Sequence, residues 1–428
     1  MIEAYGQWGT GFFALAILHT FLAPQFLNYS HKFAKDSFAA SVLHLLGEIE
    51  LVFGLWATIF LTLVMTQIGS QPVIAYIDGI HFTEPLFVFV IMVMASTRPV
   101  LFFARMCIQA LSGTLQKFTR APSYIADFLV CLTVGSLSGS FITEPAAMTV
   151  TALLLNGLLV NAKDRLLYGL LAFLFVNVSI GGALTHFAAP PILMVAAKWN
   201  WDLSYVFTHF GWKSAVAVTL NSLLFVAIFR KDLRESTISL KSLMNRQDRS
   251  ATSIPTVVWL IHLVFLALVI LTSHHANVFM GIFLLFLGVT TVTRRYQDGL
   301  RMKESLLVAF FLAGIILFGV FQKWWLQPLL AQLNDLWLFV GATTLTAVTD
   351  NAALTYLGAQ VEGLGEGSKY ALVAGAIAGG GLTIIANAPN AAGYAVFAQR
   401  FTEGFSPFKL LKWALAPTAV AVSSLWFL

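Results

Sequence analysis

The sequence predicts an all-α polytopic membrane protein, built as an inverted repeat of two five-helix halves. Of its 428 residues, 58% are hydrophobic and only 11% are charged, whereas about a quarter of the residues in soluble domains are charged. Apolar runs of about 17–25 residues, long enough to cross a bilayer as helices, recur along the chain. Both halves repeat the same order of runs and interruptions. We therefore expect about ten spans and two re-entrant helical hairpins.

Eight of the predicted spans are uninterrupted apolar runs. They cover residues 10–30, 43–66, 84–104, 212–229, 255–273, 276–293, 305–321 and 412–428. Two longer runs, 166–197 and 370–399, contain glycine, threonine and proline near their middle, and we expect each to form a broken helix. Unwound backbone is tolerated at membrane depth only where protein, water or a ligand satisfies it.

Two further apolar stretches, 124–160 and 336–358, are each interrupted by an acidic motif. The first motif is Thr-Glu-Pro-Ala-Ala, starting at Thr143, and the second is Thr-Asp-Asn-Ala-Ala, starting at Thr349. Each half-stretch is too short to cross about 30 Å of hydrocarbon at 1.5 Å per residue. The interruptions therefore predict a helical hairpin in each half that enters and leaves on the same side.

The longest polar stretch, residues 230–253, is expected to be a cytoplasmic linker between an N-terminal repeat (1–229) and a C-terminal repeat (254–428). Lysine and arginine concentrate in alternate loops, and the positive-inside rule places those loops in the cytoplasm and both termini outside. Five spans per half is an odd number, so the second repeat must be inverted. Transporters with inverted repeats bind their substrates near the membrane midplane.

Glu144 and Asp350 are the main candidates for chemistry. A carboxylate at membrane depth is protonated, paired or bound to a cation, so we predict that both bind Na⁺ in competition with H⁺. The alternative is that Asp350 caps the helix that follows; glutamate caps poorly. Oxygens of neighbouring residues are predicted to complete the ion site, with capping as the alternative for those at the tips. These residues are Thr143, Thr349 and Asn351 at the hairpin tips, and Thr185, Thr383, Asn387 and Asn390 in the breaks.

Three residues are candidates for a proton relay. His186 lies in the first helix break and titrates near neutral pH, although a hydrogen-bonded packing role is equally consistent with its position. Asp78 and Glu84 precede and begin the third predicted span, near the outer face. Because Glu84 is followed by Pro85, the motif also reads as an ordinary helix start.

The sequence offers no support for an enzyme or a cofactor. It contains no phosphate-binding loop, no metal-ligand spacing of His and Cys, and no nucleophile elbow. The net charge of +5 lies in the alternating loops, which is a topology signal and does not indicate a nucleic-acid partner. We expect membrane lipid to surround the protein, and Na⁺ and H⁺ to be its transported substrates, driven by an ion gradient.

The tips TEPAAMT and TDNAALT and the breaks GGALTHFAAPP and GGGLTIIANAPN resemble the bacterial "putative sodium/proton antiporter" family of the ion transporter superfamily. That superfamily includes the NhaD-type antiporters, which are similar in their Asp-Asn tip; Glu-Pro at the first tip here departs from it. The resemblance implies the inverted-repeat fold, a homodimer in a bacterial inner membrane, and antiport of Na⁺ and H⁺. The alternative is an ion-coupled transporter of an organic acid or oxyanion.

Overall fold

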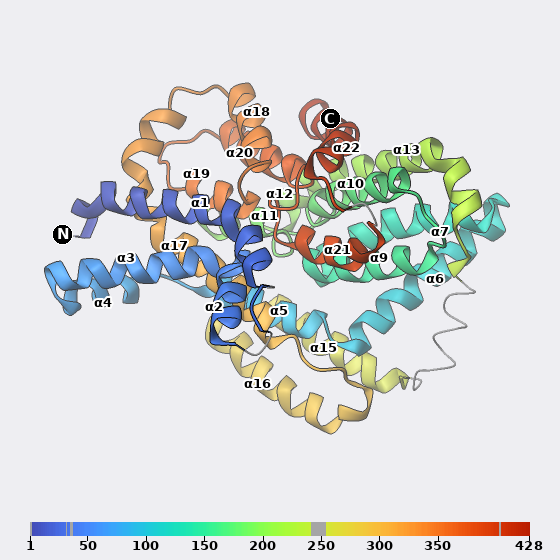
Figure 1. Ribbon diagram of the computed structural model, residues 1–428, viewed down its shortest axis with the longest axis horizontal. Coiled ribbons are helices and arrows are strands. Elements are labelled where there is room, and N and C mark those ends of the chain that lie inside the picture. The colour runs from blue at the N-terminus through green and yellow to red at the C-terminus, as the bar shows by residue number, and fades with distance from the viewer. Residues whose placement is uncertain (1, 31, 35–36, 241–253, 402–403) are drawn as a thin grey trace. The chain divides into compact units, whose positions relative to one another are not determined.

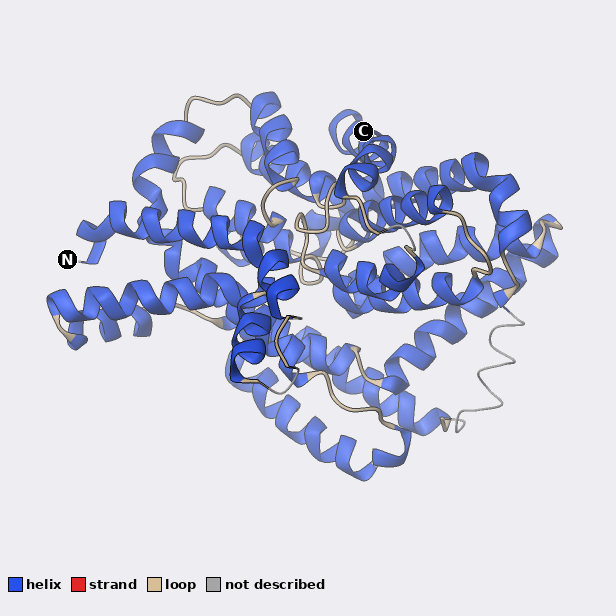
Figure 2. Cartoon of the chain, viewed as in Figure 1, coloured by secondary structure: helices blue, strands red, loops and turns tan. Residues whose placement is uncertain are grey.

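The computed structural model describes the chain except for residues 1, 31, 35–36, 241–253 and 402–403. Over the described ranges the protein is helical (Figures 1 and 2), and the β pairing there is a single isolated bridge between Leu159 and Thr237. The prediction of an all-α protein is confirmed for this part of the chain. Residues 241–253 of the predicted linker lie outside the described residues, whereas its first residues continue helix α13.

Two compact units divide the chain. Unit 1 contains residues 1–89, 302–333 and 356–365, and unit 2 contains residues 90–301, 334–355 and 366–428. Each unit therefore combines segments from both predicted repeats. A division by packing and a division by internal repetition are different properties, so the repeats 1–229 and 254–428 stay a prediction.

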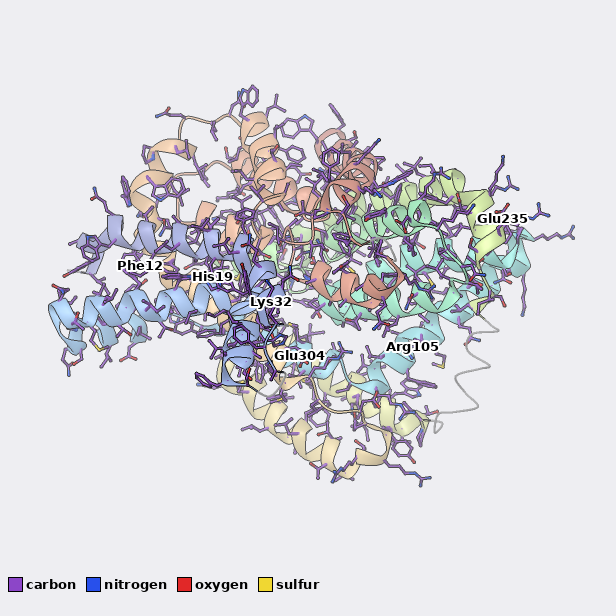
Figure 3. The ribbon with its side chains drawn as sticks, in the orientation of Figure 1. Phe12, His19, Lys32, Arg105, Glu235 and Glu304 are labelled. Carbon is purple, nitrogen blue, oxygen red and sulfur yellow. The ribbon has the colours of Figure 1, made fainter. Side chains whose placement is uncertain are left out.

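Unit 1 is built around a close contact between two long apolar helices, α3 and α17. A Cβ added to Gly314 of α17 would lie 2.3 Å from the backbone nitrogen of Gly54 in α3, so the helices meet backbone to backbone. His19 on α1, labelled in Figure 3, bonds the carbonyl of Leu46 through Nε2 (2.8 Å) and accepts a bond from Trp56 (3.1 Å). The α-helices of unit 1 are α1 (Gly6–Ser30), α2 (Phe38–Leu46), α3 (Val52–Ile68), α4 (Ser70–Asp78) and α17 (Met302–Leu330).

Helix α10 (Asp164–Gly181) forms the centre of unit 2, and every residue from Leu166 to Gly181 is buried. It packs against α9, α13, α20, α21 and α22. The unit begins with the last part of α5 (Thr83–Ala95). Its other α-helices are α6 (Arg98–Thr119), α7 (Ser123–Val130), α8 (Gly139–Ile142), α9 (Glu144–Leu158), α11 (Pro190–Trp199), α12 (Leu203–Val206), α13 (Trp212–Ser236), α15 (Thr256–Leu271), α16 (Ala276–Val292), α18 (Asp335–Thr346), α19 (Asn351–Gly358), α20 (Glu366–Gly379), α21 (Pro389–Phe397) and α22 (Pro407–Phe427). Of α19, the residues up to Thr355 belong to unit 2.

Helices end and begin at the four interruptions that the sequence predicts. In the hairpin stretches, α8 ends at Ile142 before α9, and α18 ends at Thr346 before α19. In the two long runs, α10 ends at Gly181 before α11, and α20 ends at Gly379 before α21. Figure 1 shows α9 beside α21 and α18 beside α20, which agrees with their packing contacts. Entry and exit of each hairpin on one membrane side stays a prediction.

Within the described residues, six helices are long and apolar enough to cross a membrane, or seven if the bent pair α4 and α5 forms one span. These helices identify a polytopic membrane protein. Helices α15 and α16 are also apolar but shorter than this criterion requires. The expected count of about ten spans includes such short and broken runs, so it stays a prediction.

Candidate functional site

Glu144 is the first residue of α9 and its side chain is 0% exposed. Thr143 precedes it with a φ of 71°, a left-handed conformation that turns the chain sharply between α8 and α9. Pro145, which lacks an N–H, fits the first turn of a helix. The side chain of Glu144 accepts a hydrogen bond at Oε2 from Nδ2 of Asn387, at 2.7 Å. Oε1 receives no hydrogen bond from the described residues.

Other buried polar atoms near this carboxyl group also lack hydrogen-bond partners among the described residues. They are Thr143 Oγ1, Asn387 Oδ1, Asn390 Oδ1, and both Oδ1 and Nδ2 of Asn351. The amide nitrogen of Asn390 is used, since it donates to the carbonyls of Gly380 (2.7 Å) and Thr383 (2.8 Å). A buried polar group without a partner costs about 1–3 kcal/mol, so these oxygens are suited to a bound ion.

Two glycines let the helix breaks approach the hairpins closely. A Cβ added to Gly182 would lie 2.6 Å from Oε1 of Glu144, and one added to Gly380 would lie 2.7 Å from Nδ2 of Asn351. Both distances are too short for any side chain, so glycine at these positions brings each break against the first residue of the helix that follows a hairpin tip. The backbone N–H of Asn351 also donates to the carbonyl of Ala386, next to Asn387, at 3.1 Å.

Thr185 and Thr383 fasten each break to a hairpin. Thr185 donates to the carbonyl of Ser140 and Thr383 donates to the carbonyl of Ala347, both at 2.8 Å. Each hydroxyl proton is therefore used, while the hydroxyl oxygens keep lone pairs. A role for the two threonines as ion ligands stays a prediction.

Asp350 has the geometry of a helix cap. Its Oδ1 accepts the backbone N–H groups of Ala352 (2.9 Å) and Ala353 (3.1 Å) at the start of α19. This arrangement is the capping alternative that the sequence offered for Asp350. Thr349, half-buried, comes just before it. Binding of Na⁺ by Asp350 or Thr349 stays a prediction.

The predicted relay residues lie in different places. His186 lines an open cavity of ≈ 370 Å³, and its ring stacks on His274 with centroids 5.8 Å apart. The cavity is also lined by Ala196, Ala197, Asn200, Trp201 and Asp202. Asp78, exposed at the end of α4, and Glu84, in the first turn of α5, belong to unit 1. A relay role for the three residues stays a prediction.

Sequence reasoning missed two buried serines that hold the cluster together. Ser140 donates to the carbonyl of Gly181 (2.7 Å) and accepts the N–H of Leu184 (2.9 Å). Ser179 of α10 donates to the carbonyl of Ile377 in α20 (2.8 Å), which joins the two broken helices. Single serines inside apolar runs carry no distinctive pattern, so neither serine could be singled out before the structure.

The apolar helices and the buried polar cluster between helix breaks define a multi-pass membrane protein with a polar centre. Residues 6–428 match the family described as "Putative Na+/H+ antiporter", and the chain belongs to this family. No curated protein matches the chain significantly. Family membership confirms the resemblance at the level of a cation/proton antiporter family; the relation to NhaD-type antiporters stays a prediction.

Proposed function

We propose that the protein exchanges Na⁺, or another monovalent cation, for protons, and that Glu144 binds the two ions in turn. The observation that carries the proposal is the state of this side chain. Glu144 is fully buried, one of its oxygens is bonded to a neutral amide, and no described residue forms an ion pair with it. A buried carboxylate without a positive partner requires a proton or a cation.

Competition for one carboxyl group would couple the two ions. A proton on Glu144 removes the negative charge that a cation needs, and a bound cation disfavours protonation. The free amide and hydroxyl oxygens of Asn351, Asn387, Asn390 and Thr143 would replace part of the hydration shell of the cation. Oxygen ligands of this kind suit hard cations such as Na⁺.

We further propose that the chain is an inverted repeat of two halves. Each half contributes one hairpin and one broken helix, and these four elements meet at this cluster. The homodimer and the bacterial inner membrane follow from the resemblance, and the external termini follow from the distribution of lysine and arginine. All three are part of the same proposal. Transport of an organic acid or oxyanion is less well supported, because Glu144 would repel an anion and no positive side chain is bonded to it among the described residues.

The test uses inverted membrane vesicles that contain the protein and a preset pH gradient. Addition of Na⁺ should dissipate the gradient in vesicles with the wild-type protein, and Glu144→Gln should abolish this response. The Na⁺ concentration that gives half of the maximal response should rise as the pH falls, because protons compete with Na⁺ for Glu144. Absence of a response to Na⁺, Li⁺ and K⁺ in folded wild-type protein would contradict the proposal.

A further inference from the structure

The two helix breaks contact the two hairpins through the same set of positions. In the first half, the break touches Ser136, Ser140 and Glu144 of the hairpin, through Gly181, Thr185 and Gly182 respectively. In the second half, the break touches Thr343, Ala347 and Asn351 of the hairpin, through Gly379, Thr383 and Gly380 respectively. The kinds of contact also match: a glycine against a carbonyl, a threonine hydrogen bond to a carbonyl, and a glycine against a side chain.

The spacing of these contacts is identical in the two halves. In each hairpin the three contacting residues are four positions apart, the spacing that places residues on one face of a helix. Each break presents two consecutive glycines followed by a threonine three positions after the second glycine. Matching contact to contact therefore gives one register for the whole assembly, in which Glu144 corresponds to Asn351.

We infer that Asn351, and not Asp350, is the counterpart of Glu144, so that the site holds one exchanging carboxyl group and exchanges one monovalent cation for one proton. This inference rests on the proposed function. Helix geometry agrees with the register, because Glu144 is the first residue of α9 and Asn351 is the first residue of α19. Thr143 then corresponds to Asp350, each being the residue just before its helix.

Asp350 has a different role in this assignment. Its carboxylate receives two backbone N–H groups of α19, and such bonds favour the ionised form. Asp350 also interacts electrostatically with Glu144. It therefore supplies a constant negative charge that helps to attract a cation, while Glu144 alone gains and loses the proton.

The balance of charge then fixes the exchange ratio. When a cation of charge +1 replaces the proton on Glu144, the net charge of the buried cluster is the same before and after. The exchange should therefore be electroneutral.

Purified protein in liposomes, with a Na⁺ gradient and a potential clamped by K⁺ and valinomycin, tests the ratio. For one-for-one exchange, net proton flux should vanish when the pH gradient equals the Na⁺ gradient, at every clamped potential. If the protein shows no K⁺/H⁺ exchange without valinomycin, a balance point that moves with the potential would overturn the inference while leaving Na⁺/H⁺ exchange in place. Absence of flux with every alkali cation would overturn the proposed function and the inference with it.

Two variants separate the roles of neighbouring residues. Asn351→Asp places a second carboxyl group at the counterpart position, and its balance point should become dependent on the potential. Asp350→Asn keeps a capping side chain, so any exchange that it performs should stay one-for-one. Loss of all exchange in folded Asp350→Asn would overturn the inference. The wild-type measurement decides the ratio even if Asn351→Asp fails to fold.

Discussion

Asn387 donates a hydrogen bond to Glu144 at 2.7 Å although the two residues are 243 positions apart in the sequence. The bond joins the second helix break to the helix that follows the first hairpin tip. It is therefore a direct link between the two halves of the chain at the proposed ion site.

Replacing Asn387 by alanine should weaken cation binding. The amide stabilises the ionised form of Glu144, and a hydrogen bond to a charged group contributes about 1.5–3 kcal/mol. We expect half-saturation by Na⁺ to require at least about tenfold more cation at a fixed pH, since each 1.4 kcal/mol is a factor of ten. Asn277→Ala, at an exposed position of α16, is the matched control. Equal Na⁺ affinity in both variants would contradict the role given to Asn387.

Gly182→Ala should abolish or greatly reduce exchange. The added methyl group would lie 2.6 Å from Oε1 and 2.8 Å from Cγ of Glu144, so the carboxyl group must move. Cation-dependent dissipation of a pH gradient measures the effect. Gly281→Ala introduces the same change in α16, where a Cβ meets nothing within 4 Å, and should transport like the wild type. Normal exchange by Gly182→Ala would show that the position of Oε1 is unimportant.

Asp127→Leu should destabilise the protein. Asp127 is buried and accepts hydrogen bonds from the Ser112 hydroxyl, from Gln116 (3.2 Å) and from the backbone N–H of Leu240 (2.8 Å). The hydrogen-bond partners of Asp127 are thus polar and neutral, and leucine would leave these donors unpaired at about 1–3 kcal/mol each. Thermal unfolding in detergent should show a lower Tm for Asp127→Leu than for Asp127→Asn. An unchanged Tm would count against this bonding.

Gly314→Ala should separate α3 from α17 in unit 1. Its Cβ would meet backbone atoms of Phe53 and Gly54 at 2.3–2.6 Å, and backbone cannot rotate away as a side chain can. Overpacking of this kind costs about 1–3 kcal/mol, which thermal unfolding can detect. Gly288→Ala, in the open on α16, should keep or raise the Tm. A decrease of equal size in both variants would mean that the loss is not due to this contact.

Much of the architecture could be predicted because it follows from composition and local chain chemistry. Long apolar runs must form helices in lipid, since no other structure of a single segment satisfies its backbone. Glycine, proline and threonine interrupt such runs, and the helices end at Gly181 and Gly379 within the predicted breaks. The polar cluster was partly predictable as well, because Glu144, Asn387 and Asn390 are conspicuous inside apolar sequence.

The sequence by itself therefore determined the helices, their interruptions and the candidate side chains. Only the tertiary structure decided which of these side chains meet: Asn387 with Glu144, Ser179 with Ile377, and Asp350 with the start of its own helix. The similar motifs Thr-Glu and Thr-Asp favour Asp350 as the counterpart of Glu144 in the repeat, whereas the contacts favour Asn351. The physical reason is that helix propensity and hydrophobicity act locally, but register depends on close packing between distant segments.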